Sequence, residues 1–168
     1  MLKITTLSAL FLCITTVFSQ SETIVGVAAG NENFTTLVTA VKAADLVGTL
    51  SSNGPFTVFA PVNSAFAALP SGTVESLLKP ESKSTLQGIL TYHVVAGEFM
   101  AKDVIKAIND NNGEFSVKTV AGGNITLSLS GGSVMLKDAK GGMAKVIMAD
   151  VDASNGVIHA IDTVVMPK

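Results

Sequence analysis

Several residue types are missing or scarce in this 168-residue chain, and their scarcity narrows the functions open to it. The chain contains no arginine and no tryptophan, and its eleven basic residues are all lysines, dispersed along the sequence. Arginine is the usual residue for bidentate contacts to phosphates and bases, so no nucleic-acid partner is expected. A single tyrosine and no tryptophan leave few aromatic faces on which a sugar ring could stack.

The only cysteine, Cys13, lies in an N-terminal stretch that is typical of a secretory signal peptide. Lys3 supplies a positive start, and Leu7–Phe18 is mostly apolar but shorter than the roughly 20 residues that cross a membrane. We expect residues 1–19 to be removed as a signal peptide; a buried N-terminal helix is the alternative. The mature chain would then contain no disulfide and no transmembrane span, and would be secreted or held in a periplasm.

The rest of the chain changes from a helical to a strand-like hydrophobic period. The stripe Phe34, Leu37, Val38 and Val41 predicts an amphipathic helix, and further short helices are expected up to Gly113. Beyond Gly113 apolar residues alternate with polar ones, as in strands joined by tight turns such as Gly131-Gly132 and Asn155-Gly156. Because helices and strands are segregated, the fold class is α+β, with one domain over residues 23–168.

Three segments stand out from this general pattern. Phe56–Phe66 reads as a strand stopped by Pro61 and followed by a helix that Asn63 caps, Leu90–Gly97 contains a Tyr-His pair, and Gly156–Pro167 lies close to the C-terminus. All three resemble signature segments of the fasciclin domain family, in the order that the family has them. The resemblance implies a wedge of two β-sheets, with about seven strands, and a layer of short helices.

The same resemblance implies an extracellular role in adhesion to cells or to matrix polymers. The partner would be a cell-surface receptor or an extracellular polymer, and the protein would act as a monomer or weak oligomer. The resemblance places the binding residues at Tyr92 and His93, with Leu90, Val94 and Val95 as flanks. Their own chemistry supports a second hypothesis, because apolar residues at a helix-to-strand junction are typical of a core; the pair would then hold the binding surface in shape.

Enzymatic, metal and cofactor functions have little support in the sequence. His93 and His159 lie in apolar stretches and are expected to be hydrogen-bonded core histidines. Asp162 would point to the opposite face of its strand from His159, and Asp150 and Asp152 are interpreted as solvated strand ends. No Gly-x-Ser-x-Gly elbow is present, so no enzyme is expected. Since the mature chain would also lack cysteine, no metal site is expected, and no cofactor either. An envelope protein that binds carbohydrate or a small ligand is the alternative function.

Overall fold

The computed structural model describes residues 22–168, so the predicted signal peptide over residues 1–19 lies outside the described part. The helices, in chain order, are α1 (Ile24–Ala29), η1 (Glu32–Phe34), α2 (Thr35–Ala43), α3 (Val47–Leu50), α4 (Asn63–Ala67), α5 (Thr73–Leu77), η2 (Pro80–Ser82), α6 (Lys83–Tyr92) and α7 (Ala101–Asp110). The strands are β1 (Phe56–Pro61), β2 (Val94–Ala96), β3 (Glu114–Lys118), β4 (Asn124–Ser130), β5 (Ser133–Lys137), β6 (Met143–Ala153) and β7 (Gly156–Ile161). This arrangement confirms the predicted α+β fold with seven strands.

The seven strands follow the order β2-β1-β7-β6-β5-β4-β3, and β6 divides them into two halves. Its first residues pair with β5, whereas Val146–Ala153 pairs with β7, so β6 belongs to both halves. Only β1 and β7 run parallel; the other neighbours are antiparallel. An isolated bridge between Val95 and Thr119 brings β2 next to the end of β3, and the sheet is therefore almost closed.

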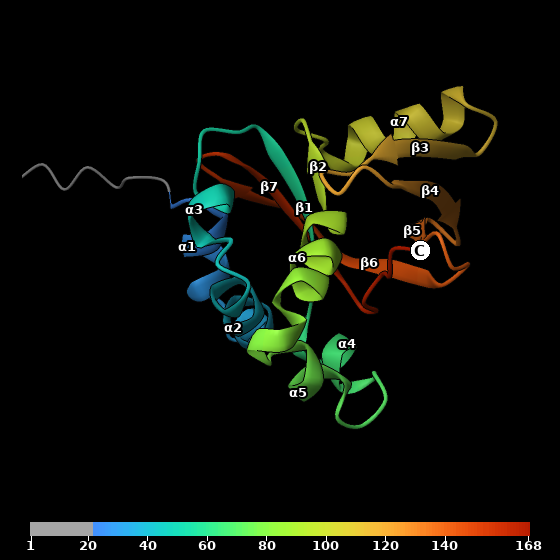
Figure 1. Ribbon diagram of the computed structural model, residues 1–168. Helices are drawn as coiled ribbons and strands as arrows, with labels where there is room; N and C mark the ends of the chain where they lie inside the picture. The colour runs from blue at the N-terminus through green and yellow to red at the C-terminus, as the bar shows by residue number, and fades with distance from the viewer. Residues whose placement is uncertain (1–21) are drawn as a thin grey trace, which may run out of the picture.

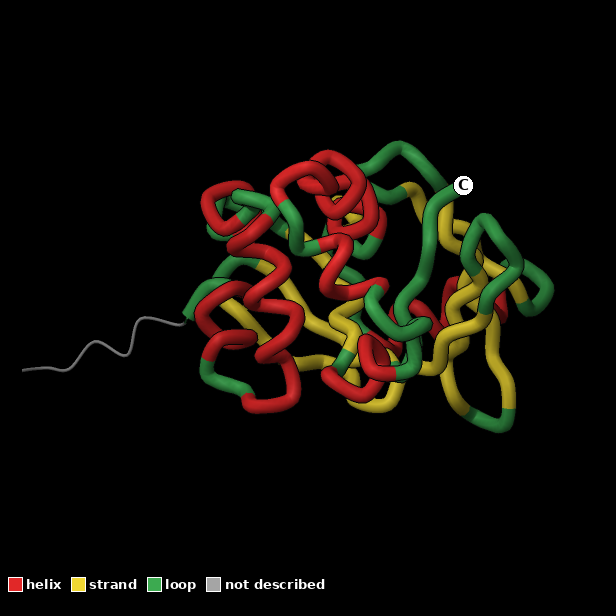
Figure 2. Tube along the Cα trace, turned by 60° about the horizontal axis from the view of Figure 1, so that its bottom comes forward, coloured by secondary structure: helices red, strands yellow, loops and turns green. Residues whose placement is uncertain are grey.

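Two hydrophobic cores lie on opposite faces of the strands β1 and β7. Val58 and Ile158 face the first core, which α1, α2 and α6 cover, whereas Phe59 and Ile161 face the second core, between the two halves of the sheet. The alternation follows from the two-residue period of a strand. Figure 1 shows the helices α1 to α6 together on one side and α7 alone beside β3 and β4, and Figure 2 shows the same segregation of helices and strands.

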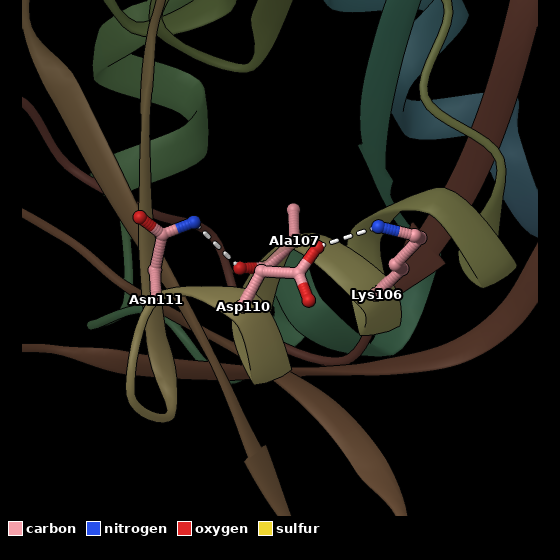
Figure 3. Close-up of polar contacts among 4 residues, drawn as sticks. All are labelled: Lys106, Ala107, Asp110 and Asn111. Atoms are coloured by element: carbon pink, nitrogen blue, oxygen red, sulfur yellow. Dashed lines mark hydrogen bonds and ion pairs between the residues drawn. The ribbon is translucent and has the colours of Figure 1, made fainter.

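Helix α7 packs on the inner face of β3 and β4 and covers the second core there. Its buried residues, Val104 and Ile108, pack in the same cluster as residues of β3 and β4. At its C-terminal end the Asn111 amide donates to the carbonyl of Ala107 at 2.7 Å, as Figure 3 shows. The same carbonyl also accepts the backbone N–H of Asn111 at 3.1 Å, so the side chain adds a second donor at the end of the helix. No helix among residues 22–168 is long and apolar enough to cross a membrane.

One of the two predicted tight turns lies at the predicted residues, and the other is shifted by one residue. Gly131 and Gly132 have φ values of 57° and 81°, and they join β4 to β5 as a two-residue hairpin. Two positive φ angles are the requirement of the turn type that matches the twist of a hairpin. The turn between β6 and β7 consists of Ser154 and Asn155, one residue earlier than the predicted Asn155-Gly156, because Gly156 already pairs with Ala153 as the first residue of β7. The helix α1 was not predicted, because Ile, Val and Gly are weak helix formers.

Candidate functional site

Tyr92, the first residue of the Tyr-His pair, is fully buried at the end of α6. Its hydroxyl donates to the carbonyl of Asn124 at 2.7 Å and accepts from the N–H of Ala139 at 3.1 Å. A Cβ atom on Gly123 would lie 2.8 Å from the Tyr92 ring, so the ring is packed directly against the backbone. Burial raises the pKa of the Tyr92 phenol, which keeps the hydroxyl protonated as a donor. The side chain thus joins α6 to the first residue of β4 and to the segment after β5.

His93 is buried as well, and both of its ring nitrogens have backbone partners. Nδ1 lies 2.8 Å from the carbonyl of Ile89, and Nε2 lies 3.2 Å from the N–H of Val165. Since a backbone N–H can only donate, Nε2 accepts and Nδ1 carries the proton. Burial lowers the pKa of His93 to about 4, which keeps the imidazole neutral at ordinary pH. The expectation of a hydrogen-bonded core histidine is confirmed.

The three flanking residues of the predicted binding segment share this environment. Leu90 is 4% exposed, Val94 3% and Val95 1%. Leu90 and Val94 pack in the first core and Val95 in the second. The structure thus brings all five predicted residues together, but it places their side chains inside the protein. Direct contact of these side chains with a partner stays a prediction.

His159, the other histidine, connects β7 to the segment before α7. Nε2 donates to the carbonyl of Phe99 at 2.7 Å, Nδ1 accepts from the N–H of Asp150 at 3.2 Å, and the ring stacks on Phe59 at a centroid distance of 5.7 Å. It is 2% exposed, so the prediction of an inward core position is confirmed. Within residues 22–168, no three His, Cys, Asp or Glu side chains gather as a metal ion would require.

Asp150 has a role that the sequence interpretation missed. It does not lie at a strand end, because β6 continues to Ala153 and its register with β7 shifts between Met148 and Val151. At this bulge Asp150 has a φ of 56°, and its carboxylate accepts from the N–H of Ala101 at 2.7 Å. The carboxylate therefore caps the first turn of α7, where a negative charge is favourable.

Asn155 is a second residue whose role could not be predicted. Its Oδ1 accepts from the N–H of Ile24 at 2.9 Å, and its Nδ2 donates to the carbonyls of Leu50 and Ser52 at 2.7 and 2.9 Å. The sequence indicates a turn at Asn155-Gly156 but gives no signal for partners more than one hundred residues away. One side chain thus fixes the start of α1 and the end of α3 to the hairpin of β6 and β7.

Two of the cavities among residues 22–168 offer little to a small ligand. An apolar cavity of about 30 Å³ lies between α1, α2 and β1, with His93 in its wall, and it is too small for a sugar ring. A more open groove of about 460 Å³ lies over Asn53, Pro55, Glu98 and Asp152, and none of its lining residues is aromatic. Neither offers the aromatic faces of a sugar-stacking pocket.

Comparisons with known proteins identify the family. The fasciclin domain matches residues 32–167 of this chain. Protein sll1483 of Synechocystis sp. is 59% identical over 148 residues, which cover 88% of this chain and 75% of that protein. Immunogenic protein MPB70 of Mycobacterium bovis is 36% identical over 154 residues, covering 88% of this chain and 71% of its own length.

A solved structure shares the fold at lower sequence similarity. It is a FAS1 domain pair from the insect cell adhesion molecule fasciclin I, with a TM-score of 0.74 and 20% sequence identity. The match covers 86% of this chain but 50% of the pair, so this chain corresponds to half of that structure. With the family match over residues 32–167, these likenesses establish that the chain belongs to the fasciclin domain family.

Proposed function

We propose that this protein is an exported interaction module that binds a cell-surface receptor or an extracellular polymer and catalyses no reaction. The family and the shared fold with an insect cell adhesion molecule support adhesion as the general role. Both histidines support the absence of catalysis. Each uses its two ring nitrogens to bind backbone groups, so neither is free to serve as a general base for a substrate.

The proposed mechanism rests on the burial of the Tyr-His pair. Tyr92 and His93 bind the backbone of Asn124, Ala139, Ile89 and Val165, and these contacts join α6 to the second half of the sheet and to the C-terminal segment. In this proposal the pair acts indirectly, since it holds the surface elements in the arrangement that a partner recognises. The protein is expected to function as a monomer or weak oligomer, with several weak contacts acting together.

Adhesion of cells and of matrix polymers to surfaces coated with the purified mature protein tests the proposal. Wild type is compared with the conservative double variant Tyr92→Phe/His93→Gln and with Tyr92→Ala/His93→Ala, while circular dichroism and thermal melts report the folded fraction. We expect wild type to adhere, the conservative variant to adhere wherever it is folded, and the alanine variant to lose adhesion together with its fold. A folded conservative variant that does not adhere would instead place the partner on Tyr92 and His93. If wild type retains no more cells than an albumin-coated surface, adhesion is the wrong function.

A further inference from the structure

The outer face of β3, β4, β5 and β6 is largely polar, and no helix of residues 22–168 lies over it. We call it the lysine face; its residues are Glu114, Ser116, Lys118, Asn124, Thr126, Ser128, Met135, Lys137, Met143 and Lys145, and all are exposed or half-buried. Residues that alternate with them, such as Val117, Ile125 and Leu136, are buried in the second core, and α7 packs on that inner side. The outer side of this half of the sheet is therefore open to a partner.

The strand register places the three lysines of this face along a diagonal. Lys137 pairs with Met143, and Lys145 lies two residues further along β6, so the Cα atoms of Lys137 and Lys145 are about 7–8 Å apart. Lys118 lies on β3, two strands away from Lys137 on β5, and is displaced from it by two residues along the strand direction. This places their Cα atoms about 12 Å apart. The positive charges thus form a spaced row rather than one compact cluster.

These lysines have no acidic partner among residues 22–168. The two ion pairs of this part of the chain are Lys83–Asp45 and Lys106–Asp110, the second of which Figure 3 shows. Glu114 is the one acidic residue of the lysine face, and it lies at the opposite end of β3 from Lys118.

Two further carboxylates lie at the border of the face and are already engaged. Asp138 accepts from the N–H groups of Lys140, Gly142 and Met166, and Asp162 accepts from the N–H of Lys145. Three lysines against Glu114 give the lysine face itself a formal charge of +2, whereas the whole chain has a formal net charge of −2.

We propose that the lysine face binds an anionic polysaccharide, a polymer of uronate or sulfated sugars. The lysines complement charges spaced along such a polymer, and the hydroxyl and amide groups of Asn124, Thr126 and Ser128 can exchange hydrogen bonds with its sugar hydroxyls. This inference rests on the proposed function, because it names the chemistry of the polymer to which the module adheres.

The arrangement favours a polysaccharide over other anionic partners. An anionic membrane is bound by clusters of four to eight basic residues, whereas this row has three separated lysines. Bidentate arginine contacts, which nucleic-acid recognition favours, are absent from the whole sequence. An uncovered sheet face also suits an extended chain better than a small ligand, which would need a concave pocket.

The test compares two triple variants of the mature protein that change the net charge equally. Lys118→Gln/Lys137→Gln/Lys145→Gln removes the row, while Lys42→Gln/Lys79→Gln/Lys102→Gln removes three exposed lysines from elsewhere. Binding to heparin, polygalacturonate, neutral dextran and vesicles containing phosphatidylserine is measured at two salt concentrations, with thermal melts as a fold check. We expect wild type to bind an anionic polysaccharide in a salt-sensitive way and dextran not at all. The face variant should bind about ten-fold or more weakly, and the control within about two-fold of wild type.

Three outcomes would overturn the inference. They are equal losses in the two triple variants, tighter binding of wild type to the vesicles than to either anionic polysaccharide, and no binding of wild type to either polysaccharide. Cell adhesion measured on the same three proteins separates this inference from the proposed function. If wild type adheres to cells but binds no anionic polysaccharide, the lysine-face inference fails and the adhesion proposal stands. If wild type binds the polysaccharide through the lysine face but retains no cells, the inference stands and the cell-surface part of the proposed function fails.

Discussion

The Nε2 atom of His93 accepts a hydrogen bond from the N–H of Val165 at 3.2 Å, across 72 residues of sequence. This bond holds the C-terminal segment against the end of α6. It requires an unprotonated Nε2, since a protonated imidazole would present a donor to another donor. The fold therefore depends on the protonation state of one buried side chain.

Acid should destabilise the protein through His93. Its pKa is about 4 in the folded protein against 6.5 in the unfolded chain, so between these values the unfolded chain binds a proton that the folded protein does not. The contribution is constant above pH 6.5 and is lost as the pH falls toward 4. At pH 5 the free energy of unfolding should have fallen by about 2 kcal/mol relative to pH 7 through this group.

Urea unfolding of wild type and His93→Gln at pH 7 and pH 5 measures this contribution. The glutamine amide offers a donor and an acceptor but does not titrate, while the carboxylates of both proteins titrate alike. Wild type should lose about 2 kcal/mol more than the variant over this range. Equal losses in the two proteins would contradict the assignment.

Tyr92→Phe should destabilise the protein without removing its ring from the core. The change leaves the carbonyl of Asn124 and the N–H of Ala139 without the hydroxyl that now satisfies both, at a cost of about 1–3 kcal/mol. Urea unfolding checks this value, with Ser130→Ala as a control that removes an exposed hydroxyl at a strand end. The control should change stability by less than about 0.5 kcal/mol. A Tyr92→Phe variant as stable as wild type would mean that water replaces the hydroxyl.

Replacing Gly156 by alanine should lower the stability of the protein, whereas replacing Gly88 by alanine should raise it. A Cβ atom on Gly156 would lie 1.9 Å from the carbonyl oxygen of Phe56, a backbone atom of the paired strand β1. Gly156→Ala must therefore separate β1 from β7, and we expect a loss of about 3 kcal/mol or failure to fold. Gly88 lies inside α6 with no atom within 4 Å of the added methyl, so Gly88→Ala should stabilise by about 0.5–1 kcal/mol. Thermal melts of both variants test the pair, and similar shifts in the two would contradict this account.

The sequence predicted those features that depend on local patterns. The hydrophobic period located α2 and the strand-rich second half, and paired glycines marked the β4–β5 hairpin. Apolar flanks also predicted that both histidines are buried. Each of these signals lies within a few residues, where side-chain period and turn chemistry act directly.

The sequence could not predict features that arise from contacts between distant segments. The bonds of Asn155 to Ile24 and Leu50 span 131 and 105 residues, and nothing near Asn155 marks its partners. The bulge that turns Asp150 toward α7 depends on the register between β6 and β7. The lysine face likewise appears only when four strands are paired, because its lysines are dispersed along the chain.

Asn63 caps a helix, as its residue type predicts, but the helix is not the one that follows it. The sequence predicts that Asn63 caps the helix that follows it, but Asn63 is the first residue of α4, and its side chain binds the start of α2. Oδ1 accepts from the N–H of Thr36 at 3.0 Å and from the hydroxyl of Thr35 at 3.1 Å, while Nδ2 donates to the carbonyl of Glu32 at 2.7 Å. The cap is therefore provided by a segment nearly thirty residues away.

Replacing Asn63 should accordingly weaken α2 rather than α4. Asn63→Ala removes all three bonds, and we expect the free energy of unfolding to fall by about 1–2 kcal/mol, the usual cost of a lost N-cap. Asn63→Asp keeps an acceptor, with a negative charge at a helix N-terminus, and should lose less than the alanine variant although its bond to Glu32 is gone. Urea unfolding ranks the three proteins, and hydrogen exchange locates the change. Faster exchange in α2 with α4 unaffected is the expected pattern, whereas faster exchange confined to α4 would restore the local cap that the sequence predicts.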